Sequence, residues 1–534
     1  MLASLWIIYT IALLLIVWVA AVGGGALRRA LNTTAMPGPA RSLFGPFPES
    51  ELLDISKCCG RYGPVFRAHT GPFSNKLVIC DTAAIAHFYA NAPTIYRATS
   101  AVRQATRNLV GRGLISVDGD HHPRQVDHRE ALSPVFNDAA VEIYSRVFLD
   151  MATKVKNMWN DALESRPRGM VLDIRHWMNS VVLDSLSVAG FSHNFESLNG
   201  NYCIITAVFY ALRAPSTSSV SDIIFRLAAY WPIFRNIPTA KNRVINDFQV
   251  SMSRISKDVL ERNTRKRGDT DDSLLGLLIK SLAEHPAGEF RLSHAEVLAQ
   301  MVSILVCLLK AKNNDILNQN TLLFAGFENT AVSLSWLLVE LARNPTIQEK
   351  LRNELQQTKG EIAHGQIKKL PYLHAVVYES LRLHPPMGDT TRVAVEDDVI
   401  PLSFPIAARS GDAITSIKVA KGTVVTVPIR HVNTSEAFWG PGSLKFNPER
   451  YWQDRSNTEF PGNRHLAFGD GPRACIGANF SLSLIKVVLS VVVSNFTLSL
   501  PEGPQTVIET SGGCIPRPRV SGQGPELLMV VRKL

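Results

Sequence analysis

The sequence predicts a mainly α-helical fold with small β-sheets, in a single large domain behind an N-terminal transmembrane helix. Three observations support this prediction. The stretch from Leu2 to Leu27 contains no charged side chain. No proline-, glycine- or serine-rich linker divides the chain after residue 50, and 46% of its 534 residues are hydrophobic. Residues 390–402 are strand-like and residues 417–427 are β-branched and hairpin-like, which together indicate a small sheet beside the helices.

The uncharged N-terminal stretch is long enough to cross a bilayer once, over about residues 4–26. Arg28 and Arg29 follow it and few positive charges precede it, so the positive-inside rule places the bulk of the chain in the cytosol. A cleaved signal peptide is the alternative, but it would need a basic start and a shorter apolar core. We therefore expect a membrane anchor over 1–27, a proline-rich hinge over 28–50 and one domain over 51–534.

Composition narrows the classes of partner and compartment. The net charge is +10, but the basic residues are scattered and form no block with aromatic residues, so nucleic acid is not an expected partner. A basic surface instead suits anionic lipid and an acidic partner protein. The seven cysteines have irregular spacing and form no disulfide framework, which favours a reducing compartment. His69, His87, His176 and His374 show no metal-ligand spacing, and we expect structural roles for them.

The segment Phe468–Gly477 contains the pattern F-x-x-G-x-R-x-C-x-G, which a chain of this length shows by chance about once in ten thousand. A helix that starts just after Cys475 would direct free N–H groups at the sulfur and favour a thiolate, the electron-rich ligand that assists O–O cleavage at a haem iron. The other positions suit the same cofactor: Phe468 as a shield for the sulfur edge, Gly469 as a turn, Arg473 as a propionate partner and Gly477 as a point of close approach. A buried structural cysteine beside a turn is the alternative.

With these residues the sequence resembles the cytochrome P450 haem-thiolate monooxygenases, over about residues 35–534. Two further motifs lie upstream of Cys475 in the family's order, E-x-x-R at Glu379–Arg382 and F-x-P-E-R at Phe446–Arg450. The resemblance implies a haem b cofactor with Cys475 as the axial iron ligand. It also implies a buried structural triad of Glu379, Arg382 and Arg450, in which one carboxylate lies between two guanidinium groups. Three unrelated surface charges are the alternative.

Two other regions resemble segments that contact the haem propionates in this family. Arg392 lies in the strand-like stretch 390–394. His122 and Arg129 match a second pair when residues 126–128 are left out of the comparison. With those residues present, Arg129 stays on the helix face of His122 but lies one turn further along. A solvated basic helix start is the alternative.

The segment Ala325–Thr330 reads A-G-F-E-N-T and resembles the family's oxygen-activating motif A-G-x-[DE]-T-[TS]. Glu328 matches the acid of the proton relay, but Asn329 occupies the usual threonine position. Thr330 follows one residue later, which rotates its side chain by about 100° around a helix. We expect the Asn329 amide to hold water or oxygen, although it cannot transfer a proton as a hydroxyl does. A polar residue that only bends the helix is the alternative.

The same helix is predicted to begin at Ser293–Glu296, a capping box, and to end at Asn344–Pro345. Such a helix would be about 78 Å long, whereas a compact domain of this size is roughly 60 Å across. Without residues 302–319 the sequence reads as a continuous family-like helix. We therefore expect 302–319 to be a lineage-specific insert or a translated, unspliced intron.

The resemblance implies a fungal-type monooxygenase with a single membrane span in the endoplasmic reticulum and a cytosolic catalytic domain. It would hydroxylate or epoxidise a hydrophobic organic substrate, such as a terpenoid secondary metabolite or a polycyclic aromatic, with O2 and electrons from NADPH. The implied electron donor is NADPH–cytochrome P450 reductase, with cytochrome b5 as a further candidate. Asn329 leaves open a haem-thiolate isomerase or dehydratase, and the 302–319 segment leaves open a haem-binding but inactive protein.

Overall fold

The structure is a computed structural model whose described residues fall into separate stretches. The main ones are 55–71, 74–100, 132–201, 321–358, 364–408, 411–452, 465–511 and 515–534, with short pieces at 24–25, 28–29, 32–39, 102–103, 129, 243, 272–274 and 276–277. The chain forms two compact units. The sheet unit consists of Met1–Thr99, Gly388–Pro441 and Gly469–Ala474, and the helical unit of Ser100–Met387, Gly442–Phe468 and Cys475–Leu534.

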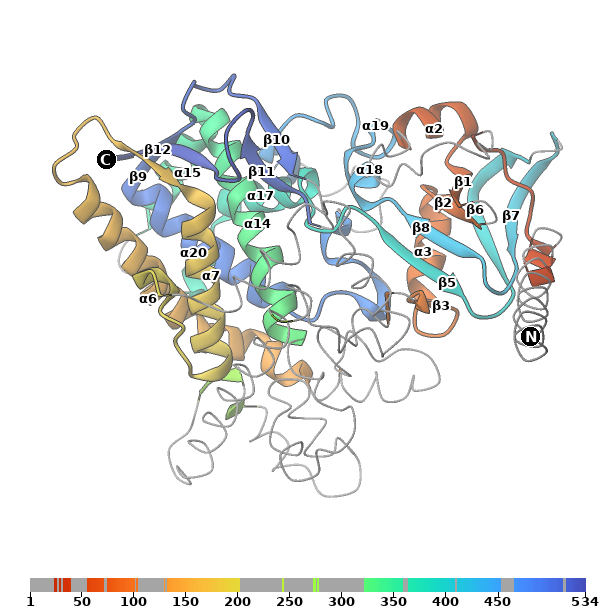
Figure 1. Ribbon diagram of the computed structural model, residues 1–534, viewed down its shortest axis with the longest axis horizontal. Helices are drawn as coiled ribbons and strands as arrows, with labels where there is room; N and C mark the ends of the chain where they lie inside the picture. Colours follow the sequence, from red (N-terminus) through yellow and green to blue (C-terminus); the bar gives the residue numbers. More distant parts are fainter. Residues whose placement is uncertain are drawn as a thin grey trace, which may run out of the picture. The chain divides into compact units, whose positions relative to one another are not determined.

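The sheet unit is built on a five-stranded sheet in the order β1-β2-β8-β5-β3 (Figure 1). In that order its strands are Val65–Gly71, Ser74–Ile79, Val424–Val427, Thr390–Ala394 and Tyr96–Arg97. β1 and β2 form an antiparallel hairpin, β8 runs parallel to β2, and β5 pairs antiparallel with β8. Buried β-branched side chains, among them Val78 and Val425, pack on this sheet as expected for strand-forming residues.

Further helices and a strand pair belong to the described part of the sheet unit. They are α2 (Ile55–Tyr62), α3 (Thr82–Ala90), α18 (Ile429–Thr434), α19 (Glu436–Trp439), β6 (Asp398–Ala407) and β7 (Ala413–Val419). The predicted hairpin-like pairing within 417–427 is wrong, because β7 pairs with β6 while β8 joins the five-stranded sheet. Gly422, at φ +84°, turns the chain between the two strands, and its N–H donates to the Ala394 carbonyl at 2.7 Å. That bond directs the chain toward β5.

The helical unit holds the long helices and two small sheets. In the described part of this unit the helices are α6 (Asp138–Leu163), α7 (Ile174–Phe191), α14 (Thr321–Arg343), α15 (Pro345–Gln356), α16 (His364–Ile367), α17 (Pro371–Leu383) and α20 (Ala478–Asn495). Its strands are β4 (Met170–Asp173), β12 (Leu528–Lys533) and β9 (Phe496–Ser499), which pair in that order, and the hairpin of β10 (Ile508–Ser511) with β11 (Arg517–Val520). Among the described residues, 3₁₀ turns lie at Ser133–Phe136, Ser197–Asn199, Pro448–Tyr451, Leu466–Phe468 and Gly471–Arg473, the last of which belongs to the sheet unit. The predicted class, mainly α with small sheets, is confirmed.

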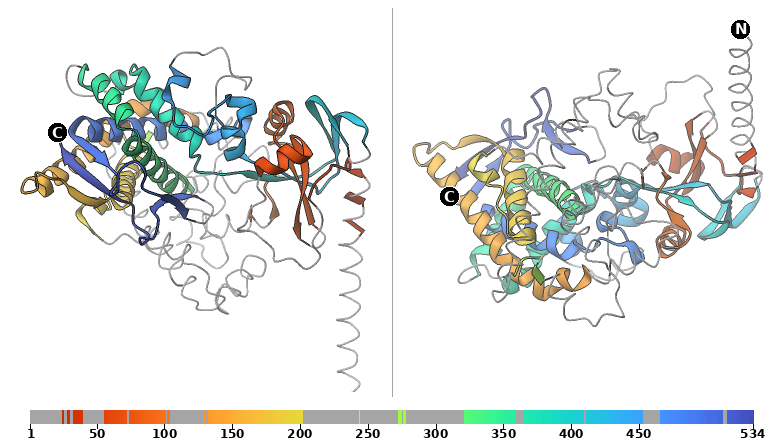
Figure 2. Two further views of the ribbon diagram at one scale, coloured as in Figure 1. Left: turned by 90° about the horizontal axis from the view of Figure 1, so that it is seen from above. Right: turned by 60° about the horizontal axis from the view of Figure 1, so that its bottom comes forward.

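Helix α14 runs through the middle of the helical unit, beside α7, α17 and α20 (Figures 1 and 2). Its residues from Phe327 to Ala342 are almost all buried, whichever side of the helix they occupy. A helix that is apolar all round packs in this way at the centre of a large protein. The helix ends at Arg343, and α15 begins at Pro345, so the predicted end at Asn344–Pro345 is confirmed.

Several predicted segments lie outside the described residues: His122, the 302–319 segment, and most of the anchor and hinge. The division into anchor, hinge and one domain therefore stays a prediction. Within the described part of the chain, α20 is the one helix long and apolar enough to cross a membrane. Since 67% of its apolar window is buried inside the protein, α20 is a core helix of the helical unit.

Candidate active site

The loop that carries Cys475 is closed by its own main chain. The Cys475 N–H donates to the Phe468 carbonyl at 2.8 Å. Gly469 and Gly471 lie between them at φ +69° and +65°, a region that side chains rarely adopt. A Cβ at Gly471 would lie 2.7 Å from the Tyr89 carbonyl oxygen, so this position requires glycine for space as well as for conformation.

The Cys475 side chain is exposed, yet enough protein lies around it that burial raises the pKa of its thiol. A hydrogen bond from the Gly477 backbone and the positive charge of Arg129 both lower this pKa, but burial is the larger effect. Helix α20 begins at Ala478 with Gly477 as its N-cap. The Gly477 N–H thus acts in the direction expected of this helix start, while the opposing effect of burial on the pKa is larger.

The residues around Cys475 fit the predicted haem. Cys475 is exposed as a residue, and the neighbouring N–H and guanidinium favour negative charge on its sulfur, as an axial thiolate ligand requires. Among the described residues, a Cβ added at Gly477 would meet only the Phe136 ring, at an ordinary contact distance of 3.8 Å. Protein packing therefore does not demand glycine at this position, whereas the close approach of a flat macrocycle would.

The three described candidates for propionate binding fall in both units. Arg129 is half-buried in the helical unit, where burial lowers its pKa and the neighbouring Cys475 raises it. Arg392 lies on β5 and Arg473 in the loop before Cys475, both in the sheet unit. Arg473 donates to the Pro93 carbonyl at 3.5 Å, and Arg392 acts electrostatically on the buried Tyr89, whose pKa is raised mainly by burial. Both arginines of the sheet unit are thus half-buried cations.

Glu328 is buried on α14 and forms an ion pair with Arg517 of β11. Arg517 is itself buried, so each charge relies on the other for compensation. Sequence reasoning missed Arg517, because β11 is far from α14 along the chain and no local motif marks it. The acid of the predicted relay is therefore held in a fixed position by a strand from the C-terminal region.

Thr330 and Asn329 form hydrogen bonds with different residues, Thr330 through its side chain and Asn329 through its main-chain carbonyl. The Thr330 hydroxyl donates to the Ser481 hydroxyl on α20 at 3.3 Å, which engages it with the helix that follows Cys475. The main-chain carbonyl of Asn329 accepts the Ser333 hydroxyl at 2.8 Å, a bond of the kind that bends helices. Gly326 allows the close approach of α7, because a Cβ there would lie 3.2 Å from the Leu186 side chain.

The predicted triad residues lie together in the helical unit. Both Glu379 and Arg382 are fully buried on α17, and Arg382 makes two hydrogen bonds of 2.7 Å to the two carboxylate oxygens. Arg450 approaches the same carboxylate with its Nε at 3.5 Å and donates from Nη2 to the Gly442 carbonyl at 2.7 Å. The Asn447 N–H donates to Glu379 at 2.9 Å. The carboxylate is thus surrounded by donors, although burial raises its pKa.

Comparisons with known proteins find similar sequences over nearly the whole chain. The chain matches the cytochrome P450 family model over residues 36–521. It is 41% identical over 545 residues to cytochrome P450 monooxygenase claP of Ampulloclitocybe clavipes, covering 98% of this chain and 97% of the relative. It is 40% identical to claQ of the same fungus, with the same coverage of both chains. It is 29% identical to cytochrome P450 monooxygenase 205 of Postia placenta, over 91% of this chain and 90% of that protein.

Proposed function

The chain belongs to the cytochrome P450 family, and on that basis we propose that this monooxygenase is membrane-anchored and hydroxylates or epoxidises a hydrophobic organic substrate. The carrying observation is the Cys475 loop, which combines an exposed cysteine, a hydrogen bond from Gly477 to its sulfur and a nearby arginine. Haem b bound to Cys475 supplies the oxygen-activating chemistry of the family. A terpenoid secondary metabolite or a polycyclic aromatic is the proposed substrate class.

The chain's own residues position protons and charge around that chemistry. Arg129, Arg392 and Arg473 are the described candidates for pairing with the haem propionates, together with His122. Phe468 is the proposed shield for the sulfur edge of the haem, and its carbonyl accepts the Cys475 N–H. His122 is assigned from its motif position alone, and the arginines from their motif positions together with the contacts and charges described above.

We assign proton handling to α14. Arg517 holds the Glu328 carboxylate in place, so Glu328 can accept and return a proton at one fixed position. Thr330 is engaged with Ser481, and Asn329 therefore carries the contact with water or oxygen at the position where the family has threonine. An amide can orient a water molecule but does not exchange its own protons in the relay.

Electron delivery and location follow from charge and hydrophobicity. The net charge of +10 suits an acidic donor such as NADPH–cytochrome P450 reductase, with cytochrome b5 as a further candidate, and it suits anionic lipid. The uncharged stretch from Leu2 to Leu27 supports a single span in the endoplasmic reticulum, with the catalytic domain in the cytosol.

Deletion of residues 2–27 should release part of the protein from membranes and leave haem content largely intact. Loss of haem on this deletion would show that the segment packs into the fold.

The proposal is tested with the full chain in membranes, a reductase, NADPH and isotopically labelled O2, over a panel of terpenoids and polycyclic aromatics. Monooxygenation predicts NADPH-dependent products that contain one labelled oxygen atom. A version without residues 302–319 is run beside the full chain, and Cys475→Ala is the inactive control. The proposal would be contradicted if both versions bind haem and neither consumes NADPH.

One observation favours a second candidate function. Asn329 replaces the usual threonine and Thr330 is bonded to α20, so the relay differs from the family pattern. A haem-thiolate isomerase or dehydratase does not need that relay. Conversion of a substrate without NADPH and without label would establish this alternative.

A further inference from the structure

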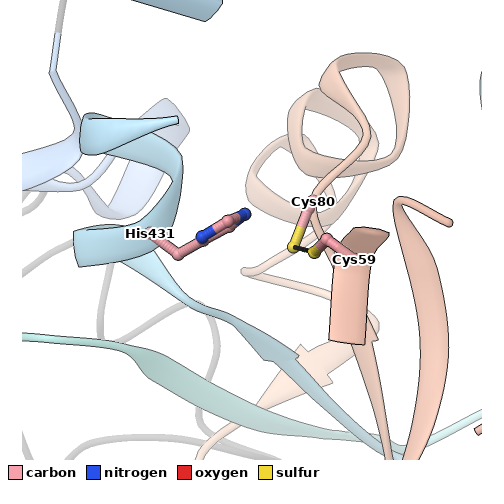
Figure 3. A group of neighbouring side chains, drawn as sticks. All are labelled: Cys59, Cys80 and His431. Atoms are coloured by element: carbon pink, nitrogen blue, oxygen red, sulfur yellow. Dashed lines mark hydrogen bonds between the residues drawn. The ribbon is translucent and has the colours of Figure 1, made fainter. Parts of the chain in front are cut away.

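Three potential metal ligands meet in the sheet unit, apart from the Cys475 loop. They are Cys59 of α2, Cys80 directly after β2 and His431 of α18 (Figure 3). The two sulfur atoms lie 3.5 Å apart, and the ligand atoms of all three residues lie within 4.8 Å of one another. Cys80 is buried, and Cys59 and His431 are partly buried. In Figure 3 the His431 ring points toward the sulfur pair.

Short, hydrogen-bonded connections hold the two cysteines in place. The Gly63 N–H donates to the Cys59 carbonyl at 2.9 Å and ends α2, with Gly63 at φ +89°. The Cys80 N–H donates to the Pro64 carbonyl at 2.7 Å, and the adjacent ladder pairs Val65 with Ile79. The end of β2 therefore lies beside the end of α2 as a consequence of the β1–β2 hairpin.

The parallel pairing of β2 with β8 brings the third ligand to the same place. Val78 pairs with Thr426, and the chain then leaves β8 at Val427 and enters α18 at Ile429. His431 lies in the first turns of α18 and reaches back toward Cys80. All three ligands thus belong to backbone segments whose positions the five-stranded sheet fixes.

We propose that Cys59, Cys80 and His431 form a zinc site. Two sulfurs bound to Zn²⁺ in a tetrahedral arrangement at about 2.3 Å would be roughly 3.8 Å apart, close to the 3.5 Å observed here. A disulfide would require about 2.0 Å and would leave the approach of His431 unexplained. Two thiolates with one imidazole favour zinc over calcium or magnesium, which prefer oxygen ligands.

Binding exchanges protons for the metal and leaves one position for a further ligand. Zn²⁺ replaces the proton of each thiol, and both protons pass to solvent, while His431 binds through a neutral ring nitrogen. With three protein ligands, a water molecule completes the tetrahedron. The metal would cross-link α2, the end of β2 and α18, and so act as a structural link within the sheet unit.

The test measures zinc in the full chain with its haem, expressed and purified under reducing conditions with zinc present. The proposal predicts about one zinc per chain after gel filtration. X-ray absorption at the zinc edge should show two sulfur ligands at about 2.3 Å and one nitrogen at about 2.0 Å. Cys80→Ser and His431→Gln should each reduce bound zinc at least tenfold under competition with a chelator. Cys58→Ser, which removes the neighbouring thiol on the same helix, should retain it.

His431→Gln keeps the test decisive if the buried Cys80→Ser variant folds poorly, because His431 is partly exposed. Haem content of each variant serves as the measure of folding. Zinc content that is substoichiometric, or equal in wild type and His431→Gln, would overturn the proposal. A Cys59–Cys80 disulfide found by mass spectrometry after rapid thiol blocking would overturn it as well.

Discussion

Two sulfur sites of this chain are built in opposite ways. The Cys475 loop is local, because the segment Phe468–Gly477 contains the ligand, its turns and the N–H that faces the sulfur. The Cys59–Cys80–His431 cluster is assembled by the fold from three separate segments. A local motif can be read from sequence, whereas an assembled cluster depends on strand order and is found only in the structure.

The two sites also differ in thiol acidity. Burial raises the pKa of Cys475. The pKa of Cys59 is lowered to about 5, first by the hydrogen bond from the Cys80 thiol and then by His431, while the pKa of Cys80 is raised by the same contact and by burial. Neighbouring donors therefore favour the thiolate at Cys59, whereas at Cys475 burial outweighs the hydrogen bond from Gly477 and the charge of Arg129.

The largest expected effect comes from disrupting the buried triad of Glu379, Arg382 and Arg450, to which we assign a role in supporting the Cys475 region. Glu379→Gln leaves the buried Arg382 without its carboxylate, which should lower the free energy of unfolding by about 3–5 kcal/mol and reduce haem retention. Glu509→Ala, which removes an exposed partner of Arg519, is the control and should change little. Chemical unfolding monitored by haem absorbance measures both. A Glu379→Gln variant that is as stable as the wild type and retains haem would contradict the structural role that we assign to the triad.

A smaller, pH-dependent effect should come from His465, which begins the described segment leading to Cys475. Burial lowers the pKa of His465 to about 3, well below the ordinary value near 6.5. Between these values the unfolded chain binds a proton that the folded chain excludes, so this group makes stability fall as pH falls. The slope approaches about 1.4 kcal/mol per pH unit below pH 6.

Unfolding curves at several pH values between 7 and 5 test this effect. The His465→Gln variant should show a shallower loss of stability toward acid than the wild type. Equal slopes in the two proteins would mean that His465 is protonated in the folded state. The His465→Gln substitution does not alter the Cys59–Cys80–His431 cluster. Any change in the pH dependence is therefore attributable to His465 and not to that cluster.

The smallest expected effect concerns coupling of NADPH use to product. Asn329→Thr should raise the fraction of NADPH that ends in product by a few-fold at most, because a hydroxyl can pass a proton on and a carboxamide cannot. The variant is made in a chain without 302–319, so that the helix register is defined. Thr330→Val, which removes the bond to Ser481, is the control and should bring no gain. Equal or poorer coupling in Asn329→Thr would favour the isomerase-like alternative.

These regions show what sequence reasoning could and could not reach. The Cys475 loop, the Glu379–Arg382 pair and the end of α14 depend on short-range spacing, and the structure places them as that spacing requires. The pairing of Glu328 with Arg517 and the approach of His431 to two cysteines depend on tertiary contacts, which no local pattern encodes. The hairpin expected within 417–427 failed for the same reason, since strand partners are chosen by the whole sheet.

The central claim is that Cys475, and no other cysteine of this chain, binds the haem iron. The most direct measurement is the carbon-monoxide difference spectrum of the reduced protein, recorded for the wild type, Cys475→Ala and Cys59→Ser at matched haem concentration. The account predicts the thiolate-type band in the wild type and in Cys59→Ser, and its complete loss in Cys475→Ala. A normal band from Cys475→Ala, or its loss in a haem-loaded Cys59→Ser variant, would contradict the assignment.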